Sequence, residues 1–236
     1  MGMLDIVKNY LGAKDRTEAA QPSVSRLMRI EDTTPRAKPT NNLTSYASVD
    51  LVAKVIESAK RQGVPAHAAL AEVQKETVWG NRDRAGIGSG RYNPMQYNGL
   101  DMAPVVQPGD KRDLKALSQE AWKKKLNNII LTHPKYIDAV AKYNKLYENG
   151  DYLSLDAERA ASQHIDDVED DIRQSAYIDA GVNYLKKMIQ KNKGNLTNAF
   201  ADYRGEGQAA RYHGRHVMEL YDSLKKNKEI NRVVGR

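Results

Sequence analysis

Glu76 is the residue whose type and setting best suit acid catalysis. It lies near the end of an apolar segment, residues 68–79, and is followed by Thr77 and, two residues later, by Trp79. Aliphatic and aromatic neighbours remove a carboxyl group from water and disfavour its charged form, so such a group can stay protonated near neutral pH. The segment therefore predicts a general acid at a helix end.

Two other stretches have features of a ligand groove. Between residues 80 and 109 the chain is rich in glycine, and Gly86, Gly88 and Gly90 suit a loop whose backbone approaches a ligand closely. Thirteen tyrosines against a single phenylalanine make the aromatic content amphipathic. Such rings can serve as core, groove wall or sugar platform. Trp122 is expected in the core, and Trp79 fits either role.

Three segments together resemble the soluble lytic transglycosylase and goose-type lysozyme family. Residues 68–79 resemble its catalytic helix end, A-x-x-x-x-E-S-x-aromatic, with Thr77 in the place of Ser. Residues 93–96, N-P-M-Q, are similar to its G-L-M-Q, which follows the family's Glu at a similar distance to that between Glu76 and Gln96. The departure is Asn-Pro in place of Gly-Leu.

The third segment is the longest match to the family. Residues 178–186, I-D-A-G-V-N-Y-L-K, resemble N-I-x-x-G-x-x-Y-L. Residues 199–207, A-F-A-D-Y-R-G-E-G, followed by Tyr212, resemble A-L-A-x-Y-N-x-G-x-G followed by a tyrosine. Here Arg204 replaces Asn, and the turn is one residue shorter. Each motif alone is weak, whereas all three in the family's order are far more specific.

The resemblance implies a mostly α, lysozyme-like domain that cuts the MurNAc–GlcNAc β-1,4 bond of peptidoglycan. Glu76 would be the only catalytic acid, and an internal attack by the muramyl 6-hydroxyl would give a 1,6-anhydro product. No cofactor and no metal are expected. The residues implied in substrate binding are Thr77, Met95, Gln96, Tyr203 and Gly205.

Two alternatives stay open. A muramidase would add a second carboxylate that activates water or attacks the sugar, and the candidates are Asp83, Asp101 and above all Glu206, in the glycine turn near Tyr203. Alternatively, the chain is a structural or wall-binding virion protein whose active site has decayed. The family's virion-associated members open the wall locally during genome entry, so a bacteriophage particle is the expected setting.

Helical periodicity places these residues on short helices. The expected helices cover about 48–63, 65–77, 115–131, 136–147, 155–171, 176–190, 195–202 and 209–226, and Ile137, Val140, Tyr143 and Tyr147 form the apolar stripe of the fourth. Residues 1–44, with Pro22, Pro35 and Pro39, are predicted to be a flexible arm that contacts virion or tail proteins. Residues 45–236 form the catalytic domain, with a long insertion at about 97–176.

Composition limits the partners. The chain has no cysteine, which excludes disulfides and a thiol nucleophile. No segment has the roughly 20 apolar residues that span a bilayer, and residues 1–11 do not read as a signal peptide. We therefore expect synthesis in the cytoplasm, association with a virion, and action on the wall in the periplasm.

Charge is concentrated toward the end of the chain. The net charge is +7, and residues 176–236 hold twelve Lys or Arg against six Asp or Glu. This suits an anionic partner such as peptidoglycan, while the lack of a recognised motif argues against nucleic acid. His213 and His216 are expected to be solvated or to cap a helix. The acidic run 166–171 lacks the spacing of a calcium loop.

Overall fold

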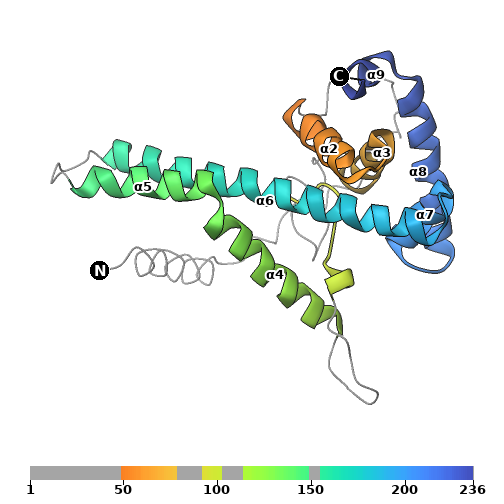
Figure 1. Ribbon diagram of the computed structural model, residues 1–236, viewed down its shortest axis with the longest axis horizontal. Helices are drawn as coiled ribbons and strands as arrows, with labels where there is room; N and C mark the ends of the chain where they lie inside the picture. The colour runs from red at the N-terminus through yellow and green to blue at the C-terminus, as the bar shows by residue number, and fades with distance from the viewer. Residues whose placement is uncertain (1–48, 79–91, 103–113, 149–154, 236) are drawn as a thin grey trace, which may run out of the picture. The chain divides into compact units, whose positions relative to one another are not determined.

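The computed structural model describes residues 49–78, 92–102, 114–148 and 155–235, and every regular element in these ranges is a helix. The predicted arm, residues 1–44, and the glycines at 86, 88 and 90 lie outside them. The mostly α class is therefore confirmed. The elements are α2 (Val49–Gln62), α3 (Ala66–Thr77), η2 (Leu100–Met102), α4 (Leu114–Thr132), α5 (Pro134–Glu148), α6 (Leu155–Lys191), α7 (Leu196–Arg204), α8 (Gln208–Lys226) and α9 (Lys228–Val234) (Figure 1).

Local signals set most of the helix ends. Gly63 takes a positive φ of 70° after α2, where a residue without a Cβ is favoured. Pro134 is the first residue of α5, a position at which its missing N–H costs no helical hydrogen bond. Asn195 caps α7 by accepting a bond from the Asn198 N–H, 3.1 Å away. Asn227 does the same for α9, a helix that the periodicity did not predict.

The prediction of two separate helices at 155–171 and 176–190 is wrong, because α6 is one continuous helix of 37 residues. No proline or glycine interrupts the chain between the two predicted pieces. Ile165, Glu169, Ile172 and Ala176 are buried at spacings of four, three and four residues, so one buried stripe crosses the junction. The acidic residues at 166–171 interrupt the apolar pattern in the sequence, which is why two helices were predicted.

The predicted stripe of α5 also needs correction. Ile137 is 42% exposed, whereas Tyr136, Ala139 and Val140 are buried. Since α5 packs on both α4 and α6, the face that these neighbours cover decides burial. Val140 is buried as predicted and Tyr143 is half-buried, so the predicted stripe is wrong at Ile137, whose place on the buried face is taken by Tyr136 and Ala139.

The main core lies where α2, α3, α6 and α8 meet. α3 is buried almost all round: Ala68, Ala69, Leu70, Ala71 and Val73 are each 0% exposed. A helix that loses all its faces to neighbours holds its ends in a defined place, which matters because Glu76 is at one of them. Phe200 of α7, Ile230 of α9 and Met95 complete the same cluster.

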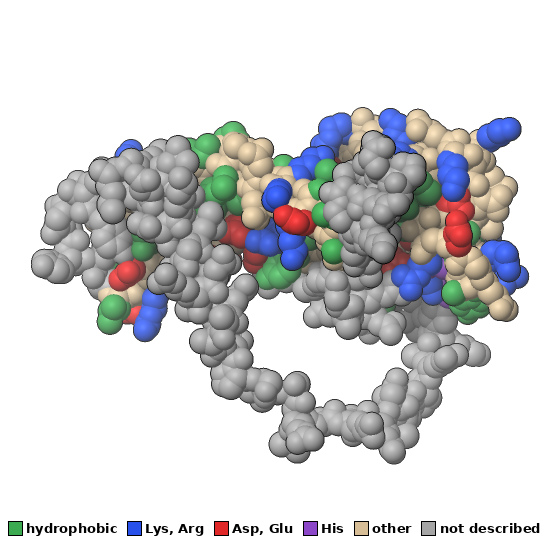
Figure 2. Space-filling view, turned by 90° about the horizontal axis from the view of Figure 1, so that it is seen from below, with side chains coloured by type: hydrophobic (Ala, Val, Ile, Leu, Met, Phe, Trp, Pro, Cys, Tyr) green, Lys and Arg blue, Asp and Glu red, His purple; other side chains and the backbone are tan. Residues whose placement is uncertain are grey.

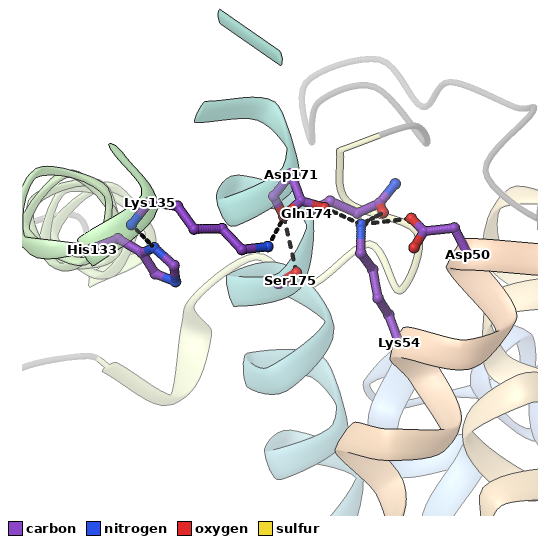
Figure 3. Close-up of polar contacts among 7 residues, drawn as sticks. All are labelled: Asp50, Lys54, His133, Lys135, Asp171, Gln174 and Ser175. Atoms are coloured by element: carbon purple, nitrogen blue, oxygen red, sulfur yellow. Dashed lines mark hydrogen bonds and ion pairs between the residues drawn. The ribbon is translucent and has the colours of Figure 1, made fainter. Parts of the chain in front are cut away.

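A polar network joins α2, α5 and α6 (Figure 3). The Lys54 ammonium of α2 lies 2.5 Å from an Asp171 carboxylate oxygen of α6 and 3.0 Å from the Gln174 side-chain oxygen. Lys135 of α5 reaches the other Asp171 oxygen at 3.4 Å. Asp171 therefore ties three helices at one point.

In the part of the chain that the structure describes, no helix combines the length and apolar character needed to cross a membrane. Lys and Arg side chains on the face shown in Figure 2 are dispersed, with acidic and apolar side chains between them.

Candidate active site

Glu76 lies in the last turn of α3 and is buried, with 6% of its surface exposed. The helix ends at Val78, which takes a left-handed conformation at φ 50° and donates its N–H to the Gln74 carbonyl at 3.1 Å. Glycine is usual at such a position, and a β-branched residue is strained there. Strain of this kind persists only where the surrounding structure holds the backbone.

Thr77 connects this helix end to the loop that carries Gln96. Its buried hydroxyl lies 2.9 Å from the Pro94 carbonyl oxygen and 3.1 Å from that of Val73. Gln96 is buried with a left-handed φ of 50°, and its side-chain amide donates to the Asn93 carbonyl at 2.9 Å. The segment beginning at Asn93 is thus held in a fixed turn beside the end of α3.

Tyr203 connects the third segment to the same loop. Its hydroxyl donates to the Met95 carbonyl oxygen at 3.0 Å. Gly181 of α6 allows this approach: a Cβ there would lie 2.7 Å from the Met95 Cβ and 3.2 Å from the Tyr203 hydroxyl oxygen. Residues around 76, 95, 181 and 203, far apart in sequence, therefore meet in one place.

The environment keeps Tyr203 protonated. Burial raises the pKa of its hydroxyl well above the ordinary value of 10.0, and the nearby Glu72 and Glu76 carboxyls raise that pKa further. The ring also packs against Tyr184 of α6, with 5.1 Å between centroids. Tyr203 acts here as a hydrogen-bond donor on a rigid support.

Glu72 and His213 are part of this site and were not predicted from the sequence. Glu72 precedes Glu76 by one helical turn on α3, so both project from the same side, and Glu72 is 0% exposed. His213, on α8, places its Nε2 3.1 Å from a Glu72 oxygen and its Nδ1 3.5 Å from a Glu76 oxygen. The imidazole ring therefore contacts both carboxyl groups, whose nearest ligand oxygens lie within 4.8 Å of each other.

The expectation that His213 is solvated or caps a helix is wrong, because only 4% of it is exposed. The spacing of apolar residues in α8 could have predicted this burial. Ala210, His213, Gly214 and Val217 are buried at helical spacing, so His213 falls on the apolar stripe of α8. Glu72 has apolar or small neighbours on both sides within α3, which is the pattern of an acid carried into a core.

The three side chains could in principle hold a metal ion, since one ligand atom from each lies within 4.8 Å of the others. The orientation of the ring fits this poorly. A metal ion would take one imidazole nitrogen and draw both carboxylates toward it, whereas here each nitrogen faces a different carboxylate. The arrangement is instead a hydrogen bond between Glu72 and His213, with the other ring nitrogen facing Glu76 at 3.5 Å.

The other predicted residues lie at the edge of this cluster or away from it. Met95 is 0% exposed and belongs to the core, while Gly205, at φ 123°, ends α7 and is exposed, as is Glu206.

The remaining candidates are a carboxylate and the aromatic residues. Asp101 accepts a hydrogen bond from the Tyr97 hydroxyl and pairs with Lys187, 2.6 Å away. Tyr212 is 60% exposed, and Trp122 is buried as expected. Trp79 and Asp83 lie outside the described residues.

A separate hollow of about 440 Å³ lies between α2, α4 and α6. Its lining includes Trp122, Arg61 and Asp171 but none of the site residues above. Its two acids are engaged: Asp179 pairs with Arg61, and Asp171 pairs with Lys54 and Lys135. This hollow is therefore distinct from the site around Glu76.

Comparison of the chain with protein families, curated proteins and solved structures finds no match in any of the three. An activity must therefore be argued from the site itself, from the buried carboxyl pair of Glu72 and Glu76 with His213 in contact with both.

Proposed function

We propose that this protein is a peptidoglycan lytic transglycosylase of lysozyme-like fold, with Glu76 as its single catalytic acid. One observation carries the proposal. The three segments that resemble this family are separated by up to about 100 residues, yet they meet around Glu76 through the Thr77–Pro94 contact, the Tyr203–Met95 hydrogen bond and the close approach at Gly181.

The reaction needs one proton, which Glu76 gives up in the first step and recovers in the second. Neutral Glu76 would protonate the glycosidic oxygen between MurNAc and GlcNAc as the bond from that oxygen to the muramyl C1 breaks. The muramyl 6-hydroxyl oxygen would then bond to C1 and give its proton to the Glu76 carboxylate. Atoms balance without water, the product is a 1,6-anhydro sugar, and Glu76 is ready for the next cycle.

The residues around Glu76 suit this chemistry because they fix the backbone next to its side chain. Thr77 and Tyr203 bond the backbone of residues 94 and 95, which fixes the loop against the end of α3. A site held by its neighbours to a fraction of an ångström is what proton delivery to one bond requires. Glu76 keeps 6% exposure, and the glycan oxygen would have to reach the carboxyl at this small exposed surface.

Hydrolysis is the alternative reaction, and it needs a second carboxylate exposed to water or sugar. Glu72 does not meet this need: one of its carboxyl oxygens lies within 4.8 Å of one of Glu76, but the side chain is fully buried. Glu206 is exposed in the turn between α7 and α8 and remains the candidate base of a muramidase. The single-acid reaction is favoured because the carboxyl beside Glu76 is the inaccessible one.

The central test is Glu76→Gln, assayed by loss of turbidity of purified peptidoglycan. The amide keeps size and polarity but delivers no proton, so we expect activity to fall by about 10²–10⁴-fold. Glu57→Gln, an exposed change on α2, is the matched control and should leave activity unaltered. A Glu76→Gln protein that keeps more than about half of the activity contradicts the assignment of the acid.

The same assay addresses the second functional class. A folded wild-type protein that binds peptidoglycan without cutting it would be a wall-binding or assembly protein with a decayed site. The setting that the resemblance suggests, a bacteriophage particle that opens the wall locally, would suit either outcome. The arm of residues 1–44 is then the candidate attachment segment.

A further inference from the structure

In the contacts of His213 with Glu72 and Glu76, each ring nitrogen is either a hydrogen-bond donor or an acceptor. His213 faces Glu72 with Nε2 at 3.1 Å and Glu76 with Nδ1 at 3.5 Å. A neutral imidazole carries one proton, so one of these nitrogens donates and the other accepts. The position of the ring proton therefore depends on which of the two carboxyl groups donates a hydrogen bond to the ring.

The second carboxyl oxygen of Glu72 indicates which group is the donor. Its Oε1 is buried and has no hydrogen-bond partner, while its Oε2 faces His213. A buried anionic oxygen without a partner is strongly disfavoured. A neutral carboxyl avoids this cost, because it donates through Oε2–H and leaves only a carbonyl-like oxygen at Oε1. Glu72 is therefore the donor, and Nε2 of His213 accepts.

We propose that His213 is a positioning residue whose ring proton is held on Nδ1 by the hydrogen bond from neutral Glu72 to Nε2, so that Nδ1–H stabilises the Glu76 carboxylate. This role rests on the proposed function, since the Glu76 anion forms when the acid has given its proton to the glycosidic oxygen. The logic is that of a residue oriented by a third group behind it.

The surrounding charges agree with a neutral Glu72. Burial raises the pKa of its carboxyl well above the ordinary 4.5, although the positive charges of Lys75 on α3 and Arg204 on α7 act to lower it. The Tyr203 hydroxyl of α7 stays protonated, as described above, and adds no charge. On α8, the pKa of His216 is lowered below 6.5, first by burial and then by Lys75.

Nitrogen NMR of the full-length protein tests the order of the hydrogen bonds without any turnover. We expect His213 to show a protonated Nδ1 and an unprotonated Nε2 at pH 7 in the wild type. Glu72→Gln should keep this tautomer, because the Gln amide can donate to Nε2 in the same way. His216, which is 40% exposed in its side chain, is the internal reference and should titrate below pH 6.5.

Kinetics on soluble glycan-strand fragments tests the effect on Glu76. His213→Phe should lower kcat on the order of 100-fold, the usual loss when one donor to a developing anion is removed, with KM little changed. His213→Asn, whose amide nitrogen is spaced like Nδ1, should recover part of that loss. Glu72→Gln should lose much less activity than His213→Phe, since a neutral donor replaces a neutral donor, and the exposed Glu57→Gln on α2 is the control that should match the wild type. Circular dichroism and melting temperature confirm folding of each variant.

Three results overturn the proposal: a ring proton on Nε2, a doubly protonated His213 at pH 7, or a folded Glu72→Gln protein as inactive as Glu76→Gln. Failure of the proposed function is a different outcome. If the wild type does not cut glycan, the role at Glu76 fails with it, while the spectra still decide the order of the hydrogen bonds.

Discussion

Glu72 shows how one buried carboxyl couples stability to pH. Its folded-state pKa is raised above the unfolded value of 4.5 by burial. Below that value the group is neutral in both states and has no effect on the balance. As the pH rises above 4.5, the unfolded chain releases the proton while the folded one keeps it, so stability falls with pH until the folded pKa is reached.

Glu72→Gln should remove this fall, because an amide does not titrate. We expect the melting temperature of the variant, relative to the wild type, to increase as the pH rises above 4.5, in a series of measurements that covers pH 4.5 to pH 8. Thermal unfolding followed by circular dichroism at intervals of pH measures the difference, with the exposed Glu57→Gln as control. A difference that is constant over this range would show that Glu72 is charged in the folded protein.

At the scale of elements, Gly181 sets how closely α6 approaches the loop at Met95. Helix propensity alone favours alanine over glycine by up to about 1 kcal/mol. A Cβ at this position, however, would meet the Met95 Cβ at 2.7 Å and its sulfur at 2.9 Å. Both atoms belong to a fully buried side chain that has little room to move.

Gly181→Ala should therefore destabilise the protein by about 1–3 kcal/mol, the usual cost of overpacking, and should lower activity by moving the loop near Glu76. Urea unfolding at constant pH measures the first effect. Asn183→Ala, an exposed change two residues further along the same helix, should be neutral or slightly stabilising. A stabilised Gly181→Ala protein would mean that α6 and the loop are further apart.

The Asp171 network joins α2, α5 and α6. Burial alone would raise the pKa of Asp171, but the Lys54 and Lys135 ammonium groups lower it below the ordinary 3.8. A carboxyl whose folded pKa is depressed contributes stability above its unfolded pKa and loses it as the pH falls through the folded one. The contribution is thus present at neutral pH and decays below pH 3.8.

Asp171→Asn should destabilise the protein at pH 7 by up to about 1 kcal/mol, since the network is partly exposed and water screens it. The difference from the wild type should shrink below pH 3.8, where the wild-type carboxyl becomes neutral as well. Melting temperatures of the two proteins at pH 7 and pH 3 provide the comparison. An equal difference at both values would rule out an electrostatic origin.

At the scale of the whole molecule, the product of cleavage distinguishes the two reactions. We expect fragments that end in 1,6-anhydromuramic acid, lighter than the hydrolysis products by one water, because no exposed carboxylate of the described residues accompanies Glu76 within its cluster. Mass spectrometry of digested peptidoglycan reads this directly. Glu206→Gln should be active; an inactive variant together with reducing-end muramic acid in the wild-type digest would identify a hydrolase.

The sequence by itself determined the helical class and most element positions, because helix formation depends on residues three and four apart. It also singled out Glu76, Thr77 and Tyr203, since each belongs to a local motif. It failed at α6, where charge masked a continuous stripe, and at α5, where neighbouring helices select the buried face.

Only the tertiary structure brought His213 into contact with Glu72 and Glu76. The histidine and Glu72 are 141 residues apart, and their contact depends on how α8 packs on α3. Periodicity indicates that a residue is buried, but not which helix lies opposite. The hydrogen bonds of a buried polar group depend on that partner, so the setting of the candidate acid was decided by packing between helices.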